Sequence, residues 1–301
     1  MLRFGRVAFV VALLLVGGAW GGTANAASNV VGAVYVLTNA ANGNAVAVYT
    51  RSADGALTPA GTVATGGLGT GAGLGSQGAV VLSKDRDWLF AVNAGSNDIS
   101  IFRVRNKGLR LIDTVASGGE RPISLTFLDD VLYVLNAGGA GNISGFQFDD
   151  GQLEPIAGST QPLSNGGSGA APGPAQIQFS PDGDLLVVTE KATNLIDVYA
   201  VDDEGQASAP QTHASSGATP FGFAFDKRDH LIVSEAFGGA PGASALSSYD
   251  VEDDALETIT GTAPTHQTAA CWVVVTRNGR YAYATNTGSN NISAYRIDRK
   301  G

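Results

Sequence analysis

The chain has 301 residues, of which 44% are hydrophobic and 41 are glycine, so it can bury a sizeable core and is too apolar for a disordered chain. Only 15% of the residues are charged, and the formal net charge is −9. A nucleic-acid partner is therefore not expected, because contacts to phosphates need a clustered basic face.

The first 26 residues have the pattern of a removable export signal. Arg3 and Arg6 precede an apolar run over residues 7–20, and the small residues 24–26 form a cleavage site. The run is shorter than the roughly 20 residues of a membrane-spanning helix. We therefore predict a mature protein that begins near Ala27, has no membrane span and is secreted or periplasmic; a retained N-terminal membrane anchor is the alternative.

A unit of similar length recurs six times after this segment. Each unit has a short apolar run that ends in Asn or Glu, then a turn rich in Gly, Asn and Ser, then an alternating run that ends in Tyr or Phe. The ends of the first run are spaced by 54, 43, 54, 45 and 51 residues, and a period of roughly 40 to 50 residues is typical of propeller blades. These six end positions are Asn39, Asn93, Asn136, Glu190, Glu235 and Asn286.

Further runs complete each unit. An apolar run precedes the pair at 78–83, 122–127, 175–180, 221–225 and 271–275, and a fourth run follows it, as at 109–116 and 256–261. Turn sequences such as Pro-Asp-Gly and Asn-Gly separate the runs. The pattern predicts an all-β fold, a β-propeller of four-stranded antiparallel blades with strands A to D, as one domain over residues 27–301. A two-sheet sandwich is the alternative, but it does not explain six near-equal units.

The two ends of the repeat are incomplete in this sequence. The first unit begins at its B strand, and the sixth stops after its C strand, so an A strand and a D strand are missing. We therefore expect a propeller that is incomplete at the C-terminus, with strand edges exposed at units one and six. Unpaired edges of this kind tend to pair with another chain or to aggregate.

Four stretches resemble a known family. Residues 76–104, 118–125, 179–199 and 267–297 are similar to exported members of the lactonase family of seven-bladed propellers, which includes bacterial 6-phosphogluconolactonase, carboxymuconate cyclase and proteins with YVTN-type repeats. The resemblance extends over residues 30–301. It implies seven blades, and it implies an activity that hydrolyses or forms the lactone ring of a small organic acid or sugar acid.

The strand order places candidate site residues on one face of the ring. The A strands of a propeller start, and its B strands end, on the same face around the central channel, so side chains of different blades converge there. The catalytic candidates on this face are Arg121, Glu190, Glu235 and His266. The substrate-binding candidates are Gln77, Asn93, Asn136, Gln176, Phe237, Gln267 and Asn286.

Each catalytic candidate has a functional and a structural interpretation. An Asn at the end of a B strand can tie down the following turn, whereas Glu190 and Glu235 suggest carboxylates that activate water; solvated or Lys191-paired acids are the alternative. Arg121 could fork onto a carboxylate or polarise a lactone carbonyl, or pair with a neighbouring acid. His266 has the chemistry of a general base, or it is an exposed loop residue.

Unit five carries an insertion beside one of these acids. The distance from Glu235 to Tyr249 is 14 residues, whereas the corresponding distance in the other five units is 9 or 10. The surplus lies at 237–242, where Phe237 is followed by glycines. We interpret this segment as a possible lid over the channel face; a neutral surface insertion is the alternative, because loops lengthen at little thermodynamic cost.

The sequence contains no motif for a metal or a cofactor. No spacing of His or Cys fits zinc, and the acidic groups at 202–204 and 252–254 fall in turns without the spacing of an EF-hand. We expect a small-molecule ligand or an unknown protein as partner. Two function hypotheses remain: an exported enzyme that hydrolyses or forms a lactone, and a non-catalytic propeller that binds its ligand on the channel face.

Overall fold

The computed structural model describes residues 30–106, 108–252 and 255–299. The predicted export signal, residues 1–26, lies outside these ranges. In the described part of the chain, all regular structure is β-strand apart from the single turn of 3-10 helix η1 (Phe237–Gly239). No helix within these ranges is long and apolar enough to cross a membrane.

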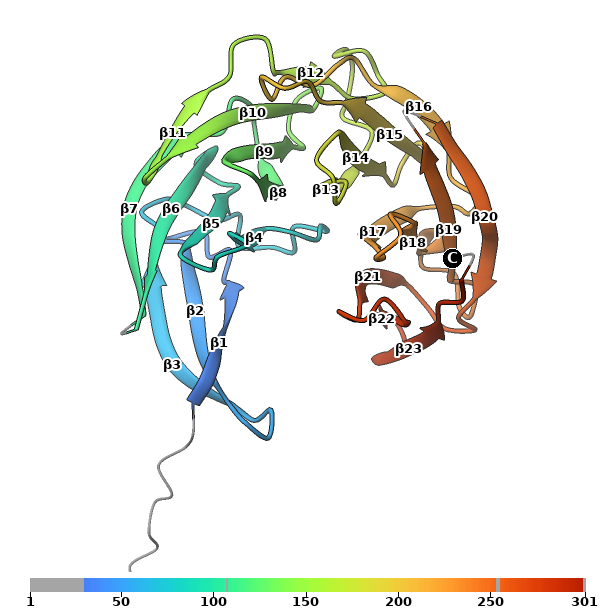
Figure 1. The fold of residues 1–301 in the computed structure, drawn as a ribbon, viewed down its shortest axis with the longest axis horizontal. Helices are drawn as coiled ribbons and strands as arrows, with labels where there is room; N and C mark the ends of the chain where they lie inside the picture. The colour runs from blue at the N-terminus through green and yellow to red at the C-terminus, as the bar shows by residue number, and fades with distance from the viewer. Residues whose placement is uncertain (1–29, 107, 253–254, 300–301) are drawn as a thin grey trace, which may run out of the picture.

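Six antiparallel sheets follow one another around a common centre (Figure 1). Each sheet is one repeat unit, and its strands are paired in sequence order from the centre outwards. The prediction of an all-β propeller is therefore confirmed. The ribbon forms an open arc, with its opening between the first and the last sheet (Figure 1).

The first three blades contain the strands of units one to three. Blade one contains β1 (Val30–Leu37), β2 (Ala45–Ser52) and β3 (Leu57–Ala64). Blade two contains β4 (Val80–Leu82), β5 (Trp88–Asn93), β6 (Asp98–Arg105) and β7 (Gly108–Ala116). Blade three contains β8 (Pro122–Leu128), β9 (Val131–Asn136), β10 (Asn142–Asp149) and β11 (Gln152–Pro155), and the short β12 (Gln161–Pro162) also pairs with β10.

The last three blades repeat this order. Blade four contains β13 (Pro174–Phe179), β14 (Leu185–Glu190), β15 (Leu195–Ala200) and β16 (Gln211–Ala214). Blade five contains β17 (Pro220–Phe225), β18 (Leu231–Glu235), β19 (Ala245–Glu252) and β20 (Ala255–Pro264). Blade six contains β21 (Ala270–Val275), β22 (Tyr281–Asn286) and β23 (Asn291–Arg296). Among the described residues the first and last sheets thus have three strands each.

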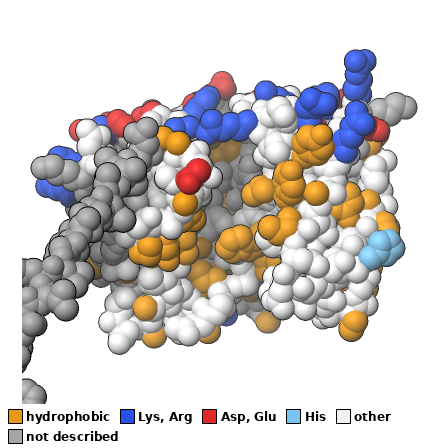
Figure 2. All heavy atoms as spheres, turned by 90° about the horizontal axis from the view of Figure 1, so that it is seen from below, with side chains coloured by type: hydrophobic (Ala, Val, Ile, Leu, Met, Phe, Trp, Pro, Cys, Tyr) orange, Lys and Arg blue, Asp and Glu red, His pale blue; other side chains and the backbone are white. Residues whose placement is uncertain are grey.

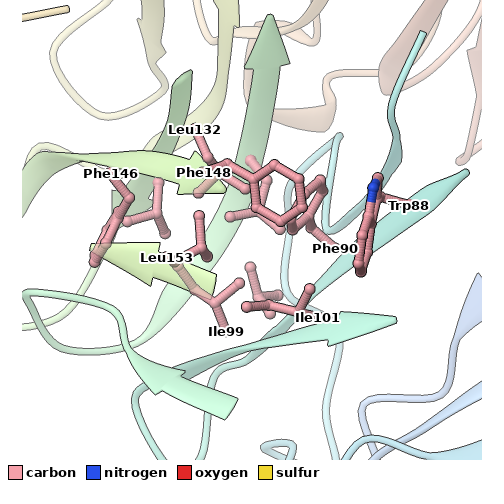
Figure 3. Packing of buried hydrophobic residues seen from close by; sticks show 11 residues of the cluster. Trp88, Phe90, Ile99, Ile101, Leu132, Phe146, Phe148 and Leu153 are labelled. Carbon is pink, nitrogen blue, oxygen red and sulfur yellow. The ribbon is translucent and has the colours of Figure 1, made fainter. Parts of the chain in front are cut away.

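The B strands of the inner blades are buried on both faces, because a blade packs on each side. All residues of β5, β14 and β18 are buried, which explains why these strands are almost continuous apolar runs. Five clusters of buried side chains lie at the five junctions between consecutive blades. Figure 3 shows the cluster between blades two and three, where Phe90, Phe148 and Trp88 meet edge to face.

Blade six shows instead the alternation of a sheet with one face uncovered. In β22, Tyr281 and Tyr283 are exposed while Ala282 and Ala284 are buried against blade five. Trp272 and Val274 of β21 are also exposed, by 53% and 59% of their surface. Figure 2 views the molecule from the side of the opening and shows hydrophobic side chains on both sides of a hollow, with charged side chains along one rim.

Candidate functional site

The asparagines at the ends of the B strands hold turns. The Asn93 side chain donates to Asp98 and to Ser100 Oγ, and the Asn286 side chain donates to Asn291 Oδ1 and Ser293 Oγ. Asn136 likewise donates to Asn142 Oδ1 and to the carbonyl of Ser117 in the linker before its blade. All three side chains are buried and hydrogen-bonded to neighbouring turn, strand or linker groups. These contacts fit the interpretation that the asparagines tie down the following turns.

Glu190 is fully buried at the same position of blade four. Its carboxyl oxygens accept hydrogen bonds from the backbone N–H and the hydroxyl of Ser164, in the linker that precedes the blade, and from Thr193 Oγ1. Asp197 on β15 is buried next to it, and Asp197 Oδ2 accepts from the same Ser164 N–H. Glu190 is therefore turned under the linker and bonded to it rather than directed towards the centre of the ring.

Glu235 has the equivalent position in blade five. Its Oε1 accepts from the backbone N–H of Gly217 and from the hydroxyls of Ser215 and Ser247, while its buried Oε2 has no partner among the described residues. Burial raises the pKa of this carboxyl, and the three hydrogen bonds oppose the rise. A Cβ built on Gly217 would lie 2.1 Å from Glu235 Oε2 and 2.9 Å from Phe237 Cζ, so Glu235 and Phe237 lie against the same glycine.

The glutamines at the starts of the A strands cross-link blades near the axis. Gln176 exchanges two hydrogen bonds with the backbone of Phe223 on β17. Gln77 donates to the carbonyls of Phe223 and Val273, and its Oε1 accepts from the N–H of Val273 on β21. Both side chains thus form the hydrogen bonds that a neighbouring strand would otherwise form with these backbone groups.

Gln77 belongs to a segment that we name the axial segment, residues 75–78, because it contacts four other blades. Its backbone exchanges hydrogen bonds with Ala175 and Leu125, and Ser76 Oγ donates to the carbonyl of Ile123. The indole N–H of Trp272 donates to the carbonyl of Ser76. Gly78 has a φ of +87°, and a Cβ there would lie 2.8 Å from Ser124 Oγ, so glycine is required at this close approach.

Lys191 reaches the axial segment from the residue that follows β14. Its Nζ donates to the carbonyl of Gly75 at 2.7 Å and to that of Pro174 at 2.6 Å, and it lies 4.8 Å from the centre of the Phe221 ring. Burial, together with the smaller effect of the positive charge of Arg121, lowers the pKa of Lys191 to about 8. Two cations therefore act on each other close to the axis.

Arg121 lies at the start of β8 in a left-handed conformation, with a φ of 55°. The carbonyl of Arg121 accepts from Ala137 after β9, and Gly173, Thr219 and Ala269 accept equivalent bonds in the next three blades. All four residues have a positive φ, so glycine is the unstrained choice at this position. The Arg121 side chain is exposed and forms no ion pair or hydrogen bond with any described residue.

A cleft of about 1060 Å³ opens beside the axial segment. It lies between blade one and blade six, and its walls include Tyr35, Phe221, Cys271 and Trp272. Gly75 and Phe221, which Lys191 contacts, form part of the lining, so the ammonium group borders the cleft. The described lining contains no acidic residue and no histidine.

The remaining candidates lie on loops between blades five and six. His266 is exposed and has a φ of 55°. Gln267 Oε1 accepts a hydrogen bond from Asn291 Nδ2, which ties the loop to β23. Neither residue lines the cleft. The charge of Arg121 thus acts on Lys191, which contacts two residues of the cleft lining. Arg121 itself, the predicted acids and the histidine are not part of that lining.

Lys191 and the aromatic wall were missed by reasoning from the sequence. The residue after each B strand end is Ala in four units, Thr in unit six and Lys in unit four. A lysine at a position where the other five units have a small residue could have identified Lys191 from the sequence. The exposed Trp272 was not readable, because an apolar residue in an A strand is ordinarily part of the core.

Comparisons with known proteins support the fold. A family model described as "Lactonase, 7-bladed beta-propeller" matches residues 31–160 and 129–236. No curated protein sequence matches the chain. Among solved structures, a protein of Lactobacillus plantarum is similar with a TM-score of 0.70 and 16% identity, over 91% of this chain and 79% of its own.

Two further structures carry names that refer to lactones. A protein of Bacteroides uniformis assigned as a 6-phosphogluconolactonase has a TM-score of 0.68 at 16% identity, over 89% of this chain and 78% of its own. The periplasmic gluconolactonase of Pseudomonas aeruginosa has a TM-score of 0.58 at 19% identity, over 75% of this chain and 65% of its own. Identities this low establish a shared fold and leave the chemistry to be argued from the site.

Proposed function

Because this chain belongs to the lactonase family of seven-bladed β-propellers, we propose that it binds a small organic acid or sugar acid, or the lactone of that acid, in the cleft beside the axial segment, and that it catalyses opening or closure of the lactone ring there. The observation that carries the proposal is a pair of cations on adjacent blades: Lys191 contacts Gly75 and Phe221 of the cleft lining, and the charge of Arg121 acts on Lys191. Both stand where other blades have small residues, and no described acid forms an ion pair with either.

The chemistry of a lactone suits this arrangement. On hydrolysis, water adds to the carbonyl carbon, the ring C–O bond breaks, the ring oxygen leaves as a hydroxyl, and the acid product releases a proton to the solvent. Negative charge develops on the former carbonyl oxygen and remains on the carboxylate. Fixed positive charge from Arg121 and Lys191 would stabilise both, and Trp272 and Tyr35 would pack against the carbon skeleton.

A second function is favoured by the composition of the cleft. Its described lining has no carboxylate or imidazole that could act as a general base, and Glu190 and Glu235 are bonded beneath linkers. A non-catalytic propeller that captures a carboxylate ligand fits the same cations. Both functions require that the protein binds a small carboxylate, but only the first requires that it also opens or closes a lactone ring.

The deciding experiment measures both properties on one protein. Glucono-1,5-lactone and a panel of related lactones are followed by acid release with a pH indicator, and binding of gluconate and other small carboxylates is measured by calorimetry. The proposal expects acid release above the uncatalysed rate and loss of binding in Lys191→Met. Binding without turnover would leave the capture function, and absence of both for all ligands would overturn the assignment of the cleft.

Export belongs to the same proposal. We propose that the chain is secreted or periplasmic, on the strength of the signal-like residues 1–26, and that residues 27–301 act as one domain. An extracellular location favours an unphosphorylated acid as ligand. N-terminal sequencing of protein recovered from outside the cytoplasm tests this, and a membrane-bound product that retains residues 1–26 would contradict it.

A further inference from the structure

We propose that Glu190 and Asp197 share one proton, and that this proton holds the linker at residues 163–173 on blade four, so that the linker is released as the pH rises. The proposal concerns a buried acid pair outside the cleft and does not depend on the identity of the ligand.

The geometry of the pair requires a proton. The backbone N–H of Ser164 donates to Glu190 Oε1 at 3.0 Å and to Asp197 Oδ2 at 3.1 Å, so these two oxygens lie side by side at one donor. Both carboxyl groups are fully buried. Two carboxylates this close in a buried site cannot both be ionised, because their repulsion adds to the cost of desolvation.

The other blades provide an internal comparison. The residues equivalent to Glu190 and Asp197 are Asn93 and Ser100 in blade two, and Asn286 and Ser293 in blade six, and in each case the amide donates to the hydroxyl. Blade five has Glu235 and Ser247, where the hydroxyl donates to the carboxyl. Each of these pairs contains its own donor. Blade four has two acids, so a proton must be taken up from the solvent.

The surrounding groups do not offer another source of positive charge. The ion pairs between described residues join Asp87 to Arg103, and Asp226 to Arg228 and His230. Lys191 follows Glu190, but its Nζ is bonded near the axis. On β16, Thr212 is the register partner of Asp197 and donates to its Oδ1, whereas His213 pairs with Ile196 and so lies on the opposite face of the sheet.

The titration of the pair follows from burial. Burial, a hydrogen bond and the charge of Glu190 raise the pKa of Asp197 to about 8, against the hydrogen bonds from Thr212 and Ser164 that lower it. Burial and, to a smaller extent, the charges of Asp197 and Glu190 raise the pKa of nearby Tyr199. The Tyr199 hydroxyl therefore stays neutral up to pH about 8, and it donates to the carbonyl of Pro162. A bound cation is a poor alternative, because the Ser164 N–H points at the two oxygens.

The sign of the pH dependence is fixed by linkage. The docked linker retains a proton up to pH about 8, whereas the released, solvated acids lose theirs near pH 4. The released state therefore gains population as the pH rises between these values, by up to about tenfold per pH unit for one proton. Release also affects the cleft, because the linker ends at Gly173, whose carbonyl accepts the N–H of Lys191.

Hydrogen exchange of the whole protein tests the proposal. Exchange of the peptide that covers residues 159–173 is followed from pH 5.5 to 8.5 and corrected for the intrinsic rate. We expect its protection to fall steeply up to pH about 8 and then to level off. The linker at residues 117–121, which Asn136 holds through neutral groups, serves as the internal reference and is expected to show no such fall.

Two variants remove the shared proton in different ways. In Glu190→Gln the new amide donates to Asp197, and Asp197→Ser reproduces the pair of blade five; both should flatten the pH profile, while the exposed-acid control Asp113→Asn should keep it. Retention of the steep profile in Glu190→Gln or Asp197→Ser would overturn the proposal. So would full protection of the linker at pH 8.5 when calcium alone is added, since this would mark a cation site.

Discussion

Replacement of Arg121 by glycine separates the stability of the blade from the binding of a ligand. Arg121 occupies a position at which blade four has Gly173, and it adopts the same left-handed conformation as that glycine. This conformation costs a non-glycine residue about 1–2 kcal/mol, whereas glycine loses about 0.5–1 kcal/mol through its greater freedom in the unfolded chain. The Arg121 side chain has no described partner to lose. Arg121→Gly should therefore leave the free energy of unfolding within about 1 kcal/mol of the wild type, with a small gain expected.

Binding should respond in the opposite direction. A hydrogen bond between a charged donor and a carboxylate contributes about 1.5–3 kcal/mol, and solvent screening at this exposed side chain reduces that to about 1–2 kcal/mol. The Kd of a carboxylate ligand should thus rise about fivefold to thirtyfold. Removal of the guanidinium should also raise the pKa of Lys191, because Arg121 is one of the causes that lower it.

The assay combines urea unfolding, calorimetric titration of gluconate and an NMR titration of the Lys191 ammonium group. Ala269→Gly is the matched control, because Ala269 has the equivalent position in blade six, a φ of 56° and no charge. This variant should show the same small change in stability and unchanged binding. The reasoning fails if Arg121→Gly lowers the free energy of unfolding by more than about 2 kcal/mol, since the side chain would then have a structural role.

Four further outcomes follow from the contacts. Binding of a carboxylate should weaken as the pH rises through about 8, where Lys191 loses its proton, and Lys191→Met should abolish this dependence in the same titration. Gly217→Ala should lower the free energy of unfolding by about 1–3 kcal/mol through overpacking against Glu235, whereas Gly73→Ala, with open space around it, should not. Gln77→Leu should cost about 1–3 kcal/mol, because the N–H of Val273 loses its partner. Ile292→Lys on the exposed face of blade six should reduce self-association in light scattering, since Ile292 is 66% exposed.

The strands were predictable because the spacing of the repeat and the positions of the turn residues indicate the same strand boundaries. The apolar runs predicted to end at Asn93, Glu190, Glu235 and Asn286 are strands β5, β14, β18 and β22, which end at these same residues. Each is a short apolar run closed by turn residues, and six copies with similar spacing leave little freedom in the assignment. The expected three-stranded sheets at both ends of the described chain are also found.

The candidate site was less predictable because it depends on which of two neighbouring residues faces the axis. Side chains alternate along a strand, so an error of one position places a residue on the wrong side. Glu190 ends β14 and lies under the linker, whereas Lys191, one residue later, reaches the axial segment. The side chain of Gln77 donates to the carbonyl of Val273, and a contact between residues 196 positions apart cannot be read from sequence spacing.

Comparison of the blades distinguishes residues that the fold requires in every blade from residues that are present in one blade only. A residue that serves the fold should recur in equivalent blades, as the Asn and Ser pairs do at the B and C strands. Arg121 and Lys191 do not recur: equivalent blades form the same backbone hydrogen bonds with Gly, Ala or Thr. The left-handed conformation of Arg121 is shared by Thr219 and Ala269 in other blades, so it belongs to the scaffold. The desolvation of Lys191 beside a second cation does not recur and carries a cost. A perturbed charge that the scaffold does not require is typical of functional sites, and an anionic ligand in the cleft would offset the cost by supplying negative charge.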